Sequence, residues 1–105
     1  MGGGWQDLGR VEEFGDGASR VFEVAGREIA VVRSADRFYA IDNACTHDGE
    51  ELASGAVEGD EIICPRHGAR FCLRTGEALT PPAYEPVRIH ELRVSDGRVS
   101  VRSAQ

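Results

Sequence analysis

The sequence predicts an all-β protein, and three observations support this prediction. Apolar residues seldom recur at the three- and four-residue spacing of a helix face. Short runs with alternating apolar and polar residues follow one another instead, and turn-forming pairs that contain glycine separate them. Because about seven such runs fit into 105 residues, we expect antiparallel strands that form a β-sandwich or a small barrel.

The expected strands, in chain order, cover residues 19–25, 28–34, 38–42, 61–64, 71–74, 87–95 and 99–102. Tight hairpin turns are expected at Gly26-Arg27, Gly59-Asp60 and Asp96-Gly97. Along 87–95 the apolar residues change phase, from Val87 and Ile89 to Leu92 and Val94. Since side chains in a strand alternate strictly between its two faces, this change predicts a bulge or bend near His90-Glu91.

The composition is that of an ordinary globular domain, with 41% hydrophobic and 29% charged residues. Without repeats or low-complexity linkers, residues 1–105 are expected to form a single domain. No apolar run approaches the ~20 residues of a membrane-spanning helix. The N-terminal segment Met1–Trp5 has neither the basic region nor the apolar region of a signal peptide. A membrane location is therefore not expected.

The net charge of −6 argues against nucleic acid or an anionic membrane as a partner, and it suits a basic patch on another protein. The chain has three cysteines, an odd number that fits no disulfide framework. Thiolates that stay free to bind a metal are expected in a reducing cytoplasm.

The strongest chemical signal is a pair of short motifs, Cys45-Thr46-His47 and Cys64-Pro65-Arg66-His67-Gly68. The first motif follows the strand expected to end at residue 42, and the second begins at the last residue of the expected strand 61–64. Both should therefore lie in loops at one tip of the β-body, where a third loop with Pro81-Pro82 could cover them. Two thiolates and two imidazoles are good ligands for soft or borderline metals. Cysteine precedes histidine in both motifs, so two facing loops could offer both cysteines to one iron and both histidines to another. This is the ligand set of a [2Fe–2S] cluster with mixed ligation.

The residues alone leave other interpretations open. One zinc ion could take the same four side chains in a closed tetrahedral site. Buried small residues or a disulfide would account for the cysteines but not for the histidines, and a cysteine–histidine catalytic pair has no obvious orienting acid. Outside the motifs, Cys72 is expected to serve packing and His90 to be a partly exposed strand residue. The remaining aromatic residues are expected in the core or at strand edges: Trp5, Phe14, Phe22, Phe38, Tyr39 and Tyr84.

The two motifs resemble the C-x-H and C-x-x-H-G motifs of Rieske iron–sulfur proteins, and the resemblance covers nearly the whole chain. It implies a Rieske-like antiparallel β-sandwich whose cluster-binding part, about residues 43–83, ends in a tip made of two loops and a proline loop. It also implies one [2Fe–2S] cluster per chain. Cys45 and Cys64 would bind the inner iron, and His47 and His67 the outer one. The ligand order of this family favours the cluster over zinc.

The chain differs from the respiratory Rieske proteins at several positions near the two motifs. Respiratory Rieske proteins tie the two loops together with a disulfide, but Glu50 and Arg66 stand at the equivalent positions. Those proteins also carry a serine and a tyrosine where this chain has Ala69 and Phe71. Because these hydroxyls stabilise negative charge on sulfur, their absence predicts a midpoint toward the low end of the Rieske span of roughly −150 to +300 mV. Backbone N–H groups around Gly49 and Gly68 are expected to donate to sulfur.

The pattern is most similar to the soluble Rieske-type ferredoxins of bacterial ring-hydroxylating oxygenase systems. It implies a monomeric, cytoplasmic one-electron carrier that is not itself an enzyme. A flavin-dependent NAD(P)H ferredoxin reductase would supply the electron, and a terminal non-haem iron oxygenase would receive it.

Two other functions stay open: an accessory or regulatory small subunit of a reductase complex, and a zinc-stabilised interaction module. The carboxylates Asp48, Glu50 and Glu51 beside the first motif are either solvated loop residues or an acidic collar that steers a basic partner.

Overall fold

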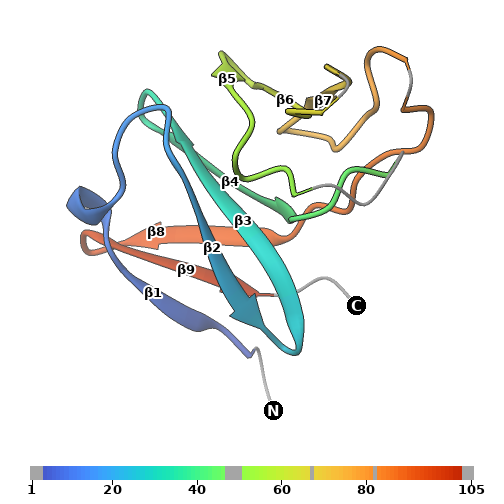
Figure 1. The fold of residues 1–105 in the computed structure, drawn as a ribbon. Coiled ribbons are helices and arrows are strands. Elements are labelled where there is room, and N and C mark those ends of the chain that lie inside the picture. The colour runs from blue at the N-terminus through green and yellow to red at the C-terminus, as the bar shows by residue number, and fades with distance from the viewer. Residues whose placement is uncertain (1–3, 47–50, 67, 82, 103–105) are drawn as a thin grey trace.

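A computed structural model of the chain describes residues 4–46, 51–66, 68–81 and 83–102. In these residues nine strands pair in three antiparallel sheets, which confirms the predicted all-β class (Figure 1). One short 3₁₀ helix, η1 (Val11–Glu13), follows the first strand. The strands are β1 (Gln6–Arg10), β2 (Ser19–Val24), β3 (Arg27–Ser34), β4 (Arg37–Asp42), β5 (Val57–Glu58), β6 (Glu61–Ile63), β7 (Arg70–Cys72), β8 (Glu91–Ser95) and β9 (Arg98–Arg102).

The sheet β2-β3-β4 lies between the other two, which have the orders β1-β9-β8 and β5-β6-β7 (Figure 1). We call the sheets β1-β9-β8 and β2-β3-β4 the base. We call residues 43–89, which contain the sheet β5-β6-β7, the tip. The chain enters the tip after β4 and returns to the base at β8.

Strand β3 connects two hydrophobic cores, because four consecutive residues, Ile29 to Val32, are fully buried. Side chains alternate along a strand, so neighbouring residues face opposite sides of the sheet. Ile29 and Val31 belong to a core shared with β1 and β9 of the base. Ala30 and Val32 belong to a second core shared with β6, β7 and the loops of the tip. The tip is therefore packed onto the base through the middle sheet.

The hairpin turns agree closely with the sequence. Turns at Gly59-Asp60 and Asp96-Gly97 are confirmed by the register of the strands on either side. Asp96 and Gly97 both have positive φ angles of 54° and 74°, as the tightest hairpin turns require. The first turn is formed by Ala25-Gly26, one residue earlier than expected, because Val24 pairs with Arg27.

The structure differs from the predicted strands in three places. Two strands, β1 and β5, were not predicted, and one predicted strand is shorter than expected. Asp7 and Gly9, which are poor strand formers, bracket a shift of register in β1, and β5 is only two residues long. The strand expected over 87–95 begins at Glu91, because Ile89 bridges to Ile41 of β4 before the chain pairs with β9. The change of phase near His90-Glu91 thus coincides with a change of partner strand.

His90 is buried, so the expectation that it would be partly exposed is wrong. Only 7% of the residue is accessible, and its ring lies 2.7 Å from the carboxylate of Asp42. Among the aromatic residues, Phe14 packs in the base core with Phe22 and Phe38 around it. Tyr84 is outside both cores, with 81% of its surface accessible.

The segment after β7 folds back onto the tip and then leads to β8. Val87 donates its backbone N–H to the carbonyl of Gly76 at 2.8 Å. A Cβ atom at Gly76 would collide with the carbonyl oxygen of Val87, and the φ angle of Gly76 is +82°. Glycine is therefore required at this close approach. No helix in the described residues has the length and hydropathy needed to cross a bilayer.

Candidate metal centre

The two motif cysteines lie at the ends of neighbouring parts of the tip core. Cys45 follows the end of β4 by three residues, and Cys64 directly follows β6. Both belong to the same hydrophobic core and are 2% and 1% exposed. Both thiols are free of disulfides. The structure thus brings together the two sulfur ligands that the sequence predicted and shields them from water.

The described residues of the second motif, 64–66 and 68, lie between β6 and β7. Cys64 donates its backbone N–H to the carbonyl of Ala69 at 2.7 Å, and Gly68 donates its N–H to the carbonyl of Cys64 at 3.0 Å. Gly68 adopts a φ of +76°, which glycine allows without strain. Its own N–H is bonded to a carbonyl, and donation to sulfur from the N–H groups around it stays a prediction. Gly49, the other expected donor, lies outside the described residues.

The stem of the first motif is held by Asn43, a residue whose role the sequence did not reveal. Asn43 is buried, and its Oδ1 accepts the backbone N–H of Ala53 at 2.8 Å. Its own backbone N–H donates to the carbonyl of Glu28 at 3.1 Å, and Nδ2 donates to Oε1 of Glu28 at 3.3 Å. One side chain therefore closes the loop that carries Cys45 and attaches it to β3. An asparagine after a strand indicates a turn, which is why this role had no distinct sequence signal.

A third loop, residues 80–85, connects the two cysteine loops through hydrogen bonds. At its start, Oγ1 of Thr80 accepts the backbone N–H of Arg70 at 3.0 Å, and Arg70 lies shortly after the second motif. At its end, the hydroxyl of Thr46 donates to the carbonyl of Glu85 at 2.7 Å, within the first motif. Ala83 between them is buried in the tip core. This is the position expected for a covering proline loop, although Pro82 itself lies outside the described residues.

Several predicted site residues lie outside the described part of the chain. They are the two histidine ligands His47 and His67 and the loop residues Asp48 and Glu50. Their roles stay predictions. Glu51, the third carboxylate beside the first motif, is exposed.

Ala69 and Phe71, which are expected to align with the hydroxyl-bearing residues of respiratory Rieske proteins, are both fully buried in the core that contains the two cysteines. These positions therefore offer no side-chain donor to sulfur.

Cys72, which was expected to serve packing, is buried outside this core. Burial raises the pKa of its thiol, but hydrogen bonds from the hydroxyl and N–H of Thr75 and the N–H of Arg74 outweigh that effect and lower the pKa overall. The thiol of Cys72 is thus bonded within its own turn.

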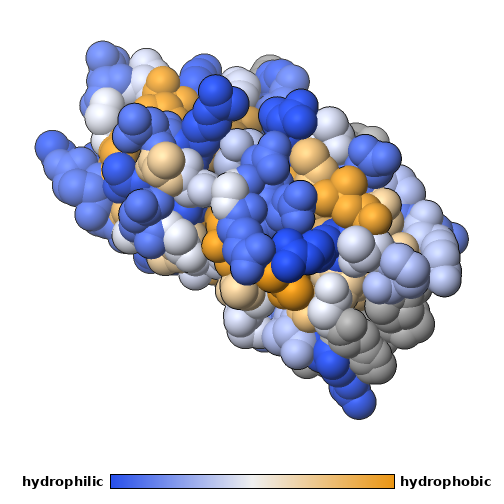
Figure 2. Space-filling model, turned by 90° about the horizontal axis from the view of Figure 1, so that it is seen from above, coloured by the Kyte–Doolittle hydropathy of each residue, from blue (hydrophilic) through white to orange (hydrophobic). Residues whose placement is uncertain are grey.

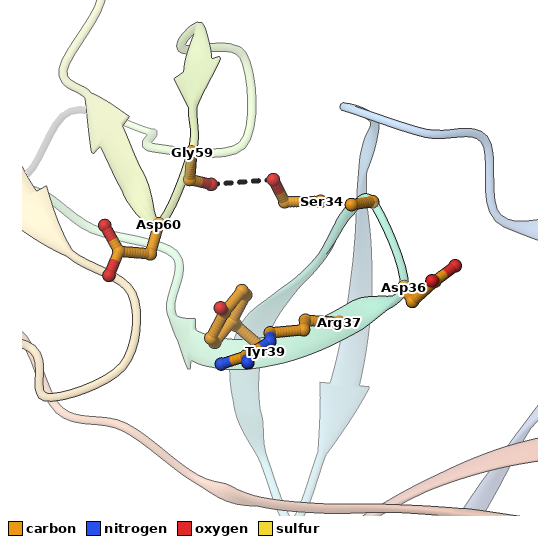
Figure 3. Close-up of a pocket in the computed structure, with 7 residues that line it drawn as sticks. Ser34, Asp36, Arg37, Tyr39, Gly59 and Asp60 are labelled. Carbon is orange, nitrogen blue, oxygen red and sulfur yellow. Dashed lines mark hydrogen bonds between the residues drawn. The ribbon is translucent and has the colours of Figure 1, made fainter.

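A surface groove of about 350 Å³ lies elsewhere, between the β3–β4 turn and the β5–β6 turn (Figure 3). The Ser34 hydroxyl donates to the carbonyl of Gly59 at 2.7 Å across it, and Arg37, Tyr39 and Asp60 line it. These residues are at the opposite ends of β4 and β6 from the cysteines. The groove is therefore separate from the candidate metal centre.

The surface seen in Figure 2 is largely hydrophilic, with smaller apolar areas among charged side chains. On the segment that follows β7, Leu79, Tyr84 and Ile89 are among the exposed large hydrophobic residues. The segment that follows β7 thus presents several apolar side chains to solvent.

Comparison with known proteins identifies the family. The Rieske [2Fe-2S] domain matches residues 4–92, which include both cysteine–histidine motifs. The chain belongs to the Rieske [2Fe–2S] family. Its cofactor is accordingly a [2Fe–2S] cluster. Cys45 and Cys64 are buried together and form no disulfide, so they are a donor set that fits such a cluster, because thiolates are the ligands that iron–sulfur clusters prefer.

Characterised relatives of this Rieske chain are ferredoxin subunits. The 3-phenylpropionate/cinnamic acid dioxygenase ferredoxin subunit of Photorhabdus laumondii is 37% identical over 92 residues, which are 87% of either chain. The anthranilate 1,2-dioxygenase ferredoxin subunit of Burkholderia cepacia is 34% identical over 92% of this chain and 90% of the relative. These relatives are electron-transfer components of dioxygenase systems, not the catalytic oxygenases.

Solved structures agree with this classification. The ferredoxin of carbazole 1,9a-dioxygenase from Nocardioides aromaticivorans matches with a TM-score of 0.91 at 32% identity, over 95% of this chain and 98% of that one. A ferredoxin solved in complex with the oxygenase of carbazole 1,9a-dioxygenase matches with a TM-score of 0.88 at 33% identity, over 94% and 93%. A putative nitrite reductase small subunit from Mycobacterium tuberculosis shares the fold, with a TM-score of 0.85 at 22% identity over 96% of each chain.

Replacing Thr46 with valine tests the bond between the first motif and the third loop. Thr46→Val removes the only hydroxyl that bonds Glu85 among the described residues while keeping the side-chain volume. Loss of one net hydrogen bond, about 1 kcal/mol, should speed loss of the cluster to a chelator about fivefold. The decay of visible absorbance measures this rate. Thr46→Ser is the control and should stay near the wild-type rate. Equal rates for the valine variant and the wild type would contradict the assigned role.

Proposed function

We propose that this chain is the one-electron carrier of a multicomponent ring-hydroxylating oxygenase system. The observation that carries the proposal is the burial of two thiols that form no disulfide, Cys45 and Cys64, in one core at a single tip of a Rieske fold. Relatives that cover most of the chain are ferredoxin subunits of such systems. The proposal treats residues 1–105 as one electron-transfer domain with no substrate chemistry of its own.

Four side chains are proposed to hold one [2Fe–2S] cluster per chain: Cys45 and Cys64 on the inner iron, and His47 and His67 on the outer iron. Bound there, the cluster would take up and release a single electron. Neutral imidazoles in place of two thiolates leave the site with less negative charge, which makes reduction easier than in an all-cysteine site. The histidine side of the tip is proposed as the place where electrons enter and leave.

The chain's own residues keep the site ordered and dry. Because Cys45 and Cys64 are almost wholly buried, water has little access to the sulfur ligands from the core side. Asn43 and Thr46 fix the first loop, and the hairpin bonds between Cys64 and Ala69 fix the second. These hydrogen bonds limit the change in the geometry of the site when it gains an electron. A smaller change in geometry lowers the reorganisation energy of electron transfer.

The proposed partners are a flavin-dependent NAD(P)H ferredoxin reductase as donor and a terminal ring-hydroxylating oxygenase as acceptor. A relative at 33% identity has been solved in complex with the oxygenase of its system. The net charge of −6 supports docking to basic surfaces, and an acidic collar of Asp48, Glu50 and Glu51 stays part of this proposal. We further propose that the carrier is monomeric and works in the reducing cytoplasm, where thiolates remain available for iron.

Reconstitution tests this function against the two open alternatives. Pure chain should contain two irons and two acid-labile sulfides (about one cluster per chain). With a ferredoxin reductase and NADH it should be reduced, and it should then support turnover by a ring-hydroxylating oxygenase. Zinc without iron would indicate the interaction module. A cluster that accepts no electron from any such reductase would favour an accessory subunit.

A matched pair of cysteine variants provides the control for this experiment. Cys45→Ser should abolish reduction by the reductase, because it removes a proposed ligand. Cys72→Ser should keep its iron and its activity, because Cys72 is bonded within its own turn and lies outside the core that holds the ligands. Equal iron content in all three proteins would refute the ligand assignment.

Replacing Ala69 with serine tests the predicted effect of the missing hydroxyls. Ala69 is buried in the core that contains both cysteines, so a hydroxyl there is expected to donate to sulfur and stabilise the reduced state. One hydrogen bond of about 1 kcal/mol corresponds to a midpoint about 40 mV higher for a one-electron couple. Protein-film voltammetry measures the shift. Ala30→Ser, a buried alanine of the same core on β3, is the control. An unchanged or lower midpoint for Ala69→Ser would show that no hydroxyl reaches sulfur from this position.

A further inference from the structure

Besides its packing on the middle sheet, the tip is connected to the base by two chain segments that meet at Asp42 and His90, and we call this meeting point the neck. Residues 43–89 leave the base after Asp42, the last residue of β4, and return at His90, directly before β8. These two residues are 48 positions apart in sequence, yet Nε2 of His90 lies 2.7 Å from Oδ1 of Asp42. The two ends of the tip are therefore joined side chain to side chain.

The contact is buried and is supported by further bonds. The His90 side chain is completely inaccessible, whereas that of Asp42 is 21% accessible. The second carboxylate oxygen of Asp42 accepts from Arg27, at the start of β3, at 3.2 Å. The ring of His90 can donate to this carboxylate in the tautomer that places the proton on Nε2. The result is a chain of three polar side chains from β3, β4 and the entrance to β8.

The backbone makes the same connection. Asp42 donates its N–H to the carbonyl of Arg88 at 2.9 Å, and His90 donates its N–H to the carbonyl of Ala40 at 2.8 Å. The two arms of the neck are thus paired like a short piece of antiparallel sheet, and the side-chain bond adds to this pairing on one side.

The bond between Asp42 and His90 lies next in sequence to two loops that approach the first motif. Asp42 precedes Asn43, which closes the loop of Cys45, and His90 follows the third loop, which bonds Thr46. If the segments at Asp42 and His90 separated, the Asn43 bond that closes the Cys45 loop and the Thr46 bond to the third loop would no longer be held in place by the base. Local opening of this kind costs less than global unfolding, and buried bonds at the ends of a segment suppress it.

We propose that Asp42 and His90 are positioning residues. Their side-chain bond, which we call the clasp, holds the two chain segments of the neck together and so keeps the Cys45 loop and the third loop in a fixed position relative to each other. The clasp acts through these loops and touches no metal. The inference rests on the proposed function only where the cluster serves as a readout, because opening of the neck can be measured on the backbone itself.

Amide hydrogen exchange on the purified full-length protein tests the clasp directly. His90→Phe removes the bond and keeps a large buried ring. Loss of a buried hydrogen bond to a charged group should raise exchange about tenfold at the neck, while the β2–β3 and β8–β9 ladders stay close to wild type. The reporting amides are those of Asp42, Asn43, Ala53, Val87 and His90 or its replacement.

Two further variants separate the clasp from general destabilisation. His90→Gln can still donate to Asp42 and should restore most of the protection. Val99→Ala, in the base core, is chosen to lower overall stability without touching the neck, and it should raise exchange in the base. If His90→Phe gives the same spread of exchange as Val99→Ala, or no change at the neck, the clasp is refuted. Should His90→Phe fail to fold, Asp42→Asn replaces it and must show the same localised pattern.

Cluster chemistry supplies a second readout that a purely structural role in the base would not change. His90→Phe should release iron to a chelator about tenfold faster, and its reduced EPR spectrum should broaden as the loops lose their register. Val99→Ala should keep the wild-type line shape. If the wild-type protein contains no iron, the proposed function fails, and the exchange pattern still decides on the clasp. Localised exchange without any effect on iron release would overturn the link between the clasp and the Cys45 loop.

Discussion

Burial of β3 on both of its faces is the constraint on which the rest of the structure depends. Ile29 and Val31 pack against the base, while Ala30 and Val32 pack against the tip. A chain of this size buries only about two-thirds of its unfolded surface, so it cannot build two independent cores of useful size. Sharing one strand between them solves this problem. It also means that the core around Cys45 and Cys64 is anchored to the most protected part of the base.

The tip holds its loops together without a disulfide. Arg66 is expected to align with a disulfide cysteine of respiratory members of the family, and the three cysteines of this chain form no disulfide. In this chain the third loop bridges the two cysteine loops through the bonds of Thr46 and Thr80. Hydrogen bonds at a surface contribute less than a covalent link, about 1 kcal/mol each against 2–4 kcal/mol. The neck contacts of Asp42 and the closure of the first loop by Asn43 therefore matter more here than they would in a disulfide-bonded relative.

The sequence predicted the parts of this account that depend on local chemistry. The two motifs identified Cys45 and Cys64, and glycine-containing turns located the later hairpins. Prediction failed where tertiary contacts decide the outcome. The segment 87–95 reads as one strand, but its first half pairs with β4 and its second half with β9. His90 was expected at the surface, because nothing local indicates that a carboxylate 48 positions away will satisfy its ring. Asn43 escaped notice for the same reason, since its acceptor role depends on the distant N–H of Ala53.

The central claim is that sulfur and nitrogen ligands of one di-iron centre meet at this tip. Electron–nuclear double resonance on the reduced protein, with ¹⁵N placed only in histidine, tests it most directly. We predict two strongly coupled imidazole nitrogens, assigned to His47 and His67 because each of the variants His47→Cys and His67→Cys should remove one of them, while His90→Gln removes neither. A reduced cluster without any coupled histidine nitrogen would contradict the account.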